Sequence, residues 1–98
     1  MAFDTGSKAV TGTAAQIEGT AANLDRRVKA VVFKARTSNG ANIYVGDSGV
    51  ATDDGYELVP NATLTPIFDE GSELWSNFFA VAGTGSPALL DWAVVFED

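Results

Sequence analysis

The 98-residue sequence contains no cysteine and no histidine. Their absence excludes disulfide bonds and the usual nitrogen and sulfur ligands of zinc. No apolar run approaches the roughly 18 residues of a membrane-spanning helix. The first residues, MAFDTGSKAV, lack the apolar segment of a secretory signal. We therefore expect no membrane partner and no secretory leader.

The missing histidine decides how the string Gly46-Asp47-Ser48-Gly49 is interpreted. In chymotrypsin-like proteases such a string surrounds the nucleophilic serine. A serine hydroxyl needs a base to remove its proton, and in those enzymes the base is an imidazole. This chain has no imidazole, and Gly, Asp and Ser are also common turn residues. We interpret the string as a turn and predict no catalytic residue and no enzyme activity.

Oxygen-bearing side chains gather around the same string. Asp47, Ser48, Asp53 and Asp54 lie within eight residues of one another, and Ca²⁺ prefers such oxygens. Their spacing differs from that of an EF-hand loop, and aspartate beside glycine is ordinary in turns. We predict neither a metal site nor a cofactor.

Basic residues are confined to the first third of the chain. All six lie within residues 1–36, whereas ten of the 13 acidic residues follow, and the net charge is −7. The acidic surface serves solubility, or the basic segment contacts an acidic neighbour. The acidic majority disfavours nucleic acid as a partner. The candidate partner-binding residues of the basic segment are Arg26, Arg27, Lys29, Lys34 and Arg36. On an alternating strand Lys34 and Arg36 share a face and Lys29 lies on the opposite one.

Short β-type segments separated by turn residues dominate the pattern. Strands are expected over residues 28–36, 42–46, 56–59, 63–68, 73–82 and 88–96. Pro66 within one of them indicates an edge or a bulge. Before residue 25, a strand followed by a loop is favoured over a weak helix. The sum predicts an all-β fold: an antiparallel, jelly-roll-like β-sandwich of seven or eight short strands. We expect a sandwich domain over residues 13–98 and an N-terminal arm over residues 1–12.

The dipeptide Asn39-Gly40 is a strong hairpin signal, because both residues tolerate a positive φ. We predict a tight turn here that joins a strand over residues 28–37 to one over 42–46. Val32, Ile43 and Val45 are expected in the core.

Aromatic residues are concentrated near the C-terminus, with Trp75, Phe78, Phe79 and Trp92. Aromatic residues on strands usually build the core. Phe78 and Phe79 are adjacent, so on a regular strand they point to opposite faces and one leaves the core. We predict Phe78 as a partner contact. The small, alanine-rich core also favours association, since a chain of this size buries little surface alone.

Five segments resemble a known family: AQI at 15–17, VKAVVFKA at 28–35, NGANIYVGDSGV at 39–50, GYELVP at 55–60 and LW at 74–75. They are similar to small β-sandwich proteins of tailed-bacteriophage virions, of the head decoration, cement or head-fibre type. The family pattern has a glycine where this chain has Asn61.

The resemblance implies a non-enzymatic structural protein that binds the outer surface of the phage head and stabilises it. Its implied partners are the major capsid protein and copies of itself, as a homotrimer. It would be made in the host cytoplasm and carried on the virion. The alternative is a carbohydrate- or receptor-binding module of a tail or fibre, with exposed aromatic residues beside Asp47, Asp53 and Asp54.

Overall fold

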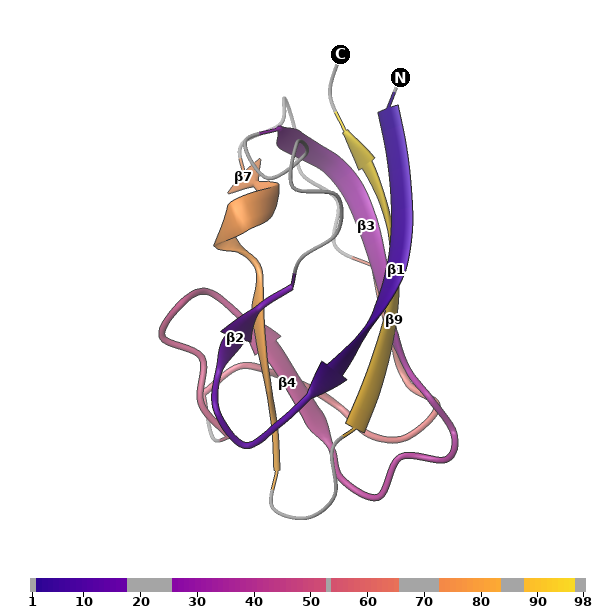
Figure 1. Ribbon diagram of the computed structural model, residues 1–98, viewed down its shortest axis with the longest axis vertical. Coiled ribbons are helices and arrows are strands. Elements are labelled where there is room, and N and C mark those ends of the chain that lie inside the picture. Colours follow the sequence, from indigo (N-terminus) through magenta and orange to yellow (C-terminus); the bar gives the residue numbers. More distant parts are fainter. Residues whose placement is uncertain (1, 18–25, 53, 66–72, 84–87, 97–98) are drawn as a thin grey trace.

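The computed structural model describes residues 2–17, 26–52, 54–65, 73–83 and 88–96, and it places two antiparallel sheets face to face (Figure 1). Sheet A has the strand order β1-β9-β3-β6, with β7 also paired to β3; sheet B has the order β2-β8-β4-β5. The strands are β1 (Ala2–Val10), β2 (Ala15–Gln16), β3 (Arg27–Ala35), β4 (Ile43–Gly46), β5 (Tyr56–Leu58), β6 (Thr63–Leu64), β7 (Glu73–Leu74), β8 (Phe79–Ala82) and β9 (Ala88–Phe96). The predicted all-β antiparallel sandwich is confirmed. The jelly-roll arrangement stays a prediction.

Strand β1 changes the expected domain boundary. It pairs with β9 in continuous register from Ala2 opposite Phe96 to Val10 opposite Ala88. Such a ladder gives the backbone groups along one side of β1 their hydrogen-bond partners. The N-terminal arm predicted over residues 1–12 is therefore corrected, because most of it is a strand of sheet A.

The central strands of sheet A show the alternation that buries one face. On β9, the even-numbered positions are buried and the residues between them are only half-buried. On β3, the register shifts between Val28 and Ala30, so that Val28 and Val31 both face the core. Such a bulge inverts the alternation beyond it. Val32 therefore lies on the outer face, and its predicted place in the core is wrong, whereas Ile43 and Val45 are buried as predicted.

The predicted hairpin at Asn39-Gly40 is also wrong. Strand β3 pairs with β6, β7 and β9, whereas β4 pairs with β5 and β8, so the segment between β3 and β4 crosses from one sheet to the other. Among the described non-glycine residues only Asn61 has a positive φ, of 74°. Asn39 thus lacks the backbone conformation of a type I′ turn. Its side chain instead bonds to β9.

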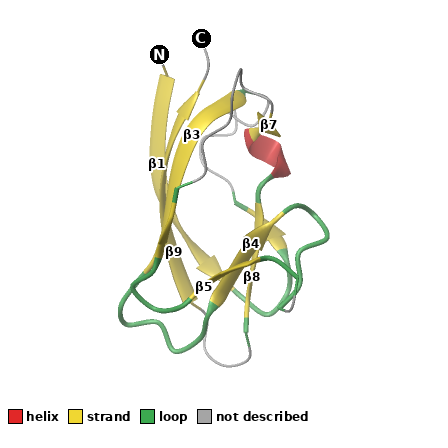
Figure 2. Cartoon of the chain, turned by 180° about the vertical axis from the view of Figure 1, so that it is seen from behind, coloured by secondary structure: helices red, strands yellow, loops and turns green. Residues whose placement is uncertain are grey.

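The segment predicted as one strand over residues 73–82 is divided in three. After β7, the 3-10 turn η3 (Trp75–Asn77) moves the chain from sheet A to sheet B, where β8 begins (Figure 2). The turn allows both Trp75 and Phe78 to enter the core, with exposed fractions of 0% and 8%. Phe79 is the half-buried member of the pair. The choice of Phe78 as a surface partner contact is therefore corrected.

Trp75 is the centre of the aromatic core. Its ring centroid lies 5.0 Å from that of Trp92, 5.3 Å from that of Phe78 and 6.3 Å from that of Phe33. These separations are typical of aromatic pairs that stabilise beyond area burial alone. This cluster joins the two sheets, because Phe33 and Trp92 come from sheet A and Phe78 directly precedes β8 of sheet B.

Candidate interaction surfaces

The string Gly46-Asp47-Ser48-Gly49 forms a turn. The N–H of Val50 donates to the carbonyl of Asp47 over 3.0 Å, and the N–H of Gly49 donates to Asp47 Oδ1 over 2.9 Å. A Cβ at position 55 would lie 2.5 Å from Val50 Cγ2, so glycine there makes room for the Val50 side chain. The turn interpretation is confirmed, and Ser48 is exposed on it.

The calcium alternative gains no support from the described residues. Asp47 bonds to the turn that it begins, and the backbone of Asp54 forms a bridge with Ala51. Asp53 lies outside the described residues. Where the chain is described, no three acidic side chains gather as a metal site would need.

The outer face of sheet A carries a continuous apolar surface. Its half-buried residues Ala30, Val32, Ala93 and Val95 come from the neighbouring strands β3 and β9, and we call this surface the outer apolar face. A shallow depression of about 190 Å³ lies on it, lined by Ala30, Val31, Val32, Thr65, Ala93 and Val95. In their middle parts both strands carry apolar residues on both sides of the sheet, and sheet B packs against only one side. The apolar residues on the other side are half-buried.

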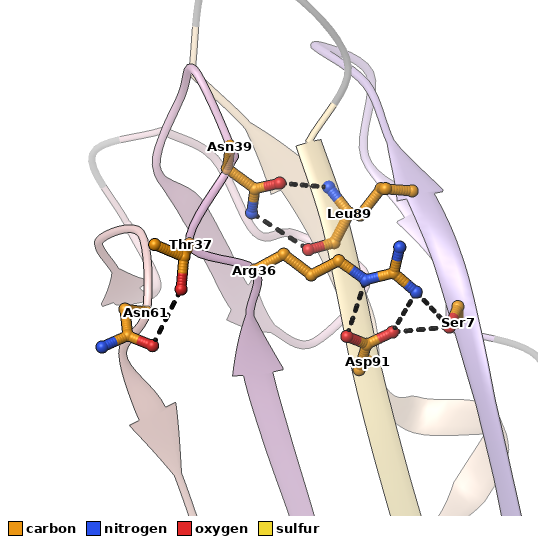
Figure 3. A network of polar contacts seen from close by, with 7 residues as sticks. All are labelled: Ser7, Arg36, Thr37, Asn39, Asn61, Leu89 and Asp91. Carbon is orange, nitrogen blue, oxygen red and sulfur yellow. Dashed lines mark hydrogen bonds and ion pairs between the residues drawn. The ribbon is translucent and has the colours of Figure 1, made fainter.

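A polar network of Arg36, Asp91 and Ser7 lies next to the outer apolar face, near the end of β3 (Figure 3). Arg36 Nε donates to Asp91 Oδ2 over 2.8 Å and Arg36 Nη2 donates to Asp91 Oδ1 over 2.8 Å. Ser7 of β1 donates to the same carboxylate and accepts from Arg36 Nη2 over 3.2 Å. Because Lys34 is paired with Asp91 across the ladder, Lys34 and Arg36 share the outer face, as predicted.

This network shifts two ionisation equilibria. The hydrogen bonds from Arg36 hold the pKa of Asp91 below its ordinary value, although partial desolvation opposes them. The hydrogen bond to Asp91 likewise raises the pKa of Arg36. Both side chains are more than a third exposed, at 44% for Arg36 and 36% for Asp91. The bidentate geometry fixes the direction of the Arg36 side chain along the sheet. The Arg36 guanidinium therefore already has a partner, Asp91, within the same chain.

The remaining basic candidates lie near the start of β3. The Arg26 guanidinium carbon lies 5.3 Å from the centre of the Phe96 ring, which is cation–π geometry. Arg27 and Lys29 are exposed. Lys29 falls within the bulge, so strand alternation no longer predicts that it lies on the face opposite to that of Lys34. The structure thus separates the five basic candidates into two groups, one at each end of β3.

Sheet B carries a polar cluster that the sequence did not indicate. Tyr44 Oη donates to Glu57 Oε2 over 2.8 Å, and Asn42 Nδ2 donates to the same oxygen over 3.2 Å. The cluster depends on the pairing of β4 with β5, which places Tyr44 opposite Glu57. Tyr56, which is paired with Val45, lies on the other face of the sheet and is 58% exposed. With Asp47 and Asp54 also exposed here, sheet B and its turns are acidic where β3 of sheet A is basic.

Among the described residues, no helix is long and apolar enough to cross a membrane. Comparison with protein-family models, with curated proteins and with solved structures finds no match for this chain.

Proposed function

We propose that this chain is a structural protein of a tailed-bacteriophage virion, of the decoration or cement type, and that it docks on the outer surface of the head through its outer apolar face. The observation that carries the proposal is this half-buried apolar surface between Lys29 and Lys34 on β3. Apolar surface rimmed by polar residues is typical of a protein–protein contact. The segments that resemble phage head proteins support the same assignment.

Docking of this kind would act mechanically. A copy seated across neighbouring capsid subunits would bury surface on each of them, and that buried area would have to be lost before the subunits could separate. Lys29 and Lys34 would favour an acidic patch on the shell. Exposed charges of this kind change the association rate and the orientation more than the strength of a contact.

The test uses purified protein and phage heads that lack it, with binding measured by co-sedimentation and the positions of the bound copies by electron microscopy. We expect saturable binding of many copies over the shell. Val32→Glu on the outer apolar face and Lys34→Glu at its rim should both weaken binding. Glu57→Gln on sheet B is the control and should bind normally. Failure of the wild-type chain to bind heads would contradict the proposal.

A carbohydrate- or receptor-binding module is the second candidate, and the cluster of Tyr44, Glu57 and Asn42 favours it. Aromatic and carboxylate groups together suit a polyhydroxylated ligand. Binding of the chain to host cells, lost in Glu57→Gln and kept in Val32→Glu, would support this candidate. A few copies at the tail, in place of many on the shell, would support it as well.

A further inference from the structure

Strand β1 ends sheet A on one side and is long for an edge strand. In the part of the chain that the structure describes, it pairs only with β9, and that pairing runs over nine residues without a register shift. Edge strands expose a row of backbone N–H and C=O groups, and native proteins usually protect them with bulges, prolines, charges or short length. β1 contains no proline or bulge, and its charged residues are Asp4 and Lys8 alone.

The sequence of β1 is complementary to itself when it is read in opposite directions from Gly6. In AFDTGSKAV, an antiparallel copy centred on Gly6 places Asp4 opposite Lys8 and Thr5 opposite Ser7. The outermost positions place apolar residues opposite apolar residues. Opposite charges and matched polarity at facing positions are what stabilises strand pairs. This register therefore has no unfavourable pair anywhere along its length.

We propose that two copies of this chain pair antiparallel along β1, about a two-fold axis at Gly6, so that their A sheets become one continuous sheet. The inference does not rest on the proposed function, because it concerns only the edge of sheet A. A two-fold contact of this kind uses the same surface on both copies and closes on itself. Pairing also covers an exposed edge that would otherwise favour aggregation.

The geometry of the single chain agrees with this register. Asp4 and Lys8 lie on the same side of β1, because residues four apart on a strand share a face, and both are half-buried. Their backbone positions are about 13 Å apart along the strand, which is far beyond ion-pair distance for the short Asp4 side chain. A carboxylate accepts several hydrogen bonds at once, so Asp4 can bind Lys8 of a second copy in addition to its bond from the N–H of Thr5.

Gly6 suits a position on the two-fold axis. It is half-buried, and the indole of Trp92 occupies the space where its side chain would be. The two strands can therefore meet at the axis without a collision between side chains. In this register an even-numbered residue always lies opposite an even-numbered residue of the second copy, and an odd-numbered residue opposite an odd-numbered one. Facing residues therefore point to the same side, and the buried faces of the two joined sheets lie on the same side.

The first test measures self-association by sedimentation equilibrium from low to high micromolar concentration. We expect the wild type to form a dimer. Asp4→Lys alone and Lys8→Asp alone each place two pairs of like charges opposite one another, and each should raise the dissociation constant about tenfold. A mixture of the two variants restores both pairs, as does the double variant, so both should dimerise about as strongly as the wild type. Near-ultraviolet circular dichroism of the buried tryptophans checks that each variant is folded.

A second test fixes the register and uses the natural absence of cysteine. Thr5→Cys and Ser7→Cys, when mixed, place the two thiols directly opposite one another and should form a disulfide between copies under mild oxidation. Each variant alone places its thiols two residues out of register, beyond the separation that a disulfide allows, and should cross-link much more slowly. A monomeric wild type, a trimer, single charge reversals without effect, or equal cross-linking in all samples would overturn the proposal.

Discussion

Gly6 on β1 lies opposite Trp92 on β9, and a Cβ at position 6 would lie 2.5 Å from Cζ2 of the indole. Two non-bonded carbon atoms do not tolerate that separation, and the ring is held by its neighbours in the aromatic core. We predict that Gly6→Ala lowers the free energy of unfolding by about 1–3 kcal/mol, since overpacking against the buried indole forces shifts in side chains and backbone. The measurement is urea denaturation followed by tryptophan fluorescence. Gly12→Ala is the control, because nothing lies within 4 Å of its Cβ position, and an equal loss there would contradict the packing argument.

The side-chain amide of Asn39 connects the segment between β3 and β4, which crosses from sheet A to sheet B, to strand β9. Its Oδ1 accepts from the N–H of Leu89 over 2.8 Å, and its Nδ2 donates to the carbonyl of Leu89 over 3.0 Å. Asn39→Ala would leave both backbone groups without these partners. We expect the free energy of unfolding to fall by about 1–3 kcal/mol. The control Asn42→Ala removes one exposed side-chain bond, to Glu57, and should cost clearly less in the same denaturation experiment.

The ion pair of Arg36 and Asp91 predicts a stability that depends on pH. The pKa of Asp91 is lower in the folded chain than in the unfolded one, so the carboxylate stabilises the fold above the unfolded pKa of about 3.9. This contribution is lost as the pH falls through the lower, folded pKa. Asp91→Asn should therefore be less stable than the wild type at about pH 7, and the difference between the two proteins should be smaller at about pH 2.5.

Urea midpoints of both proteins at the two pH values test this prediction. The effect is expected to be small, because both groups are partly exposed and water screens their attraction. Added salt should reduce it further at neutral pH. A gap between the two proteins that persists at low pH would indicate that Asp91 acts through packing or hydrogen bonding and not through its charge.

The two neighbouring phenylalanines should differ sharply in their contribution to stability. Phe78 is 8% exposed and its ring centroid lies 5.3 Å from that of Trp75, whereas Phe79 is only half-buried. We predict that Phe78→Ala costs about 3–5 kcal/mol, the range for a large buried aromatic side chain, and that Phe79→Ala costs less than half as much. Thermal denaturation of both variants measures the difference. Similar losses would contradict the assignment of Phe78 to the core.

The regular strands were predictable from the sequence because their residue alternation is a local signal. The range predicted for β9, residues 88–96, agrees with the structure, and the buried set Leu90, Trp92, Val94 and Phe96 follows from alternation alone. The turn at Asp47 was predictable for the same reason, since its residue types favour a turn in most surroundings.

The errors concern features that depend on contacts distant in the sequence. Asn39-Gly40 is a good hairpin sequence, but in the fold β3 takes β9 as its neighbour, and the Asn39 amide bonds to Leu89, 50 residues away. The bulge after Val28 and the turn η3 each shift the alternation of buried and exposed residues, and the residue types in these two segments do not predict either feature. Among the candidate contact residues, the sequence predicted that Lys34 and Arg36 share one face of the sheet. It did not predict that Asp91 is the partner of Arg36.

The place of β9 at the centre of sheet A has a consequence for how the chain acquires its fold. Strand β9 lies between β1 and β3, so among the described strands β1 has no neighbour until β9 has been made, whereas β3 can already pair with β6 and β7. During synthesis the preceding chain can assemble sheet B and the pairs of β3 with β6 and β7, but sheet A is joined to β1 only after β9 has been made. Pairing of strands so distant in sequence requires closure of a long loop, which places such domains among the slower folders, in milliseconds to seconds.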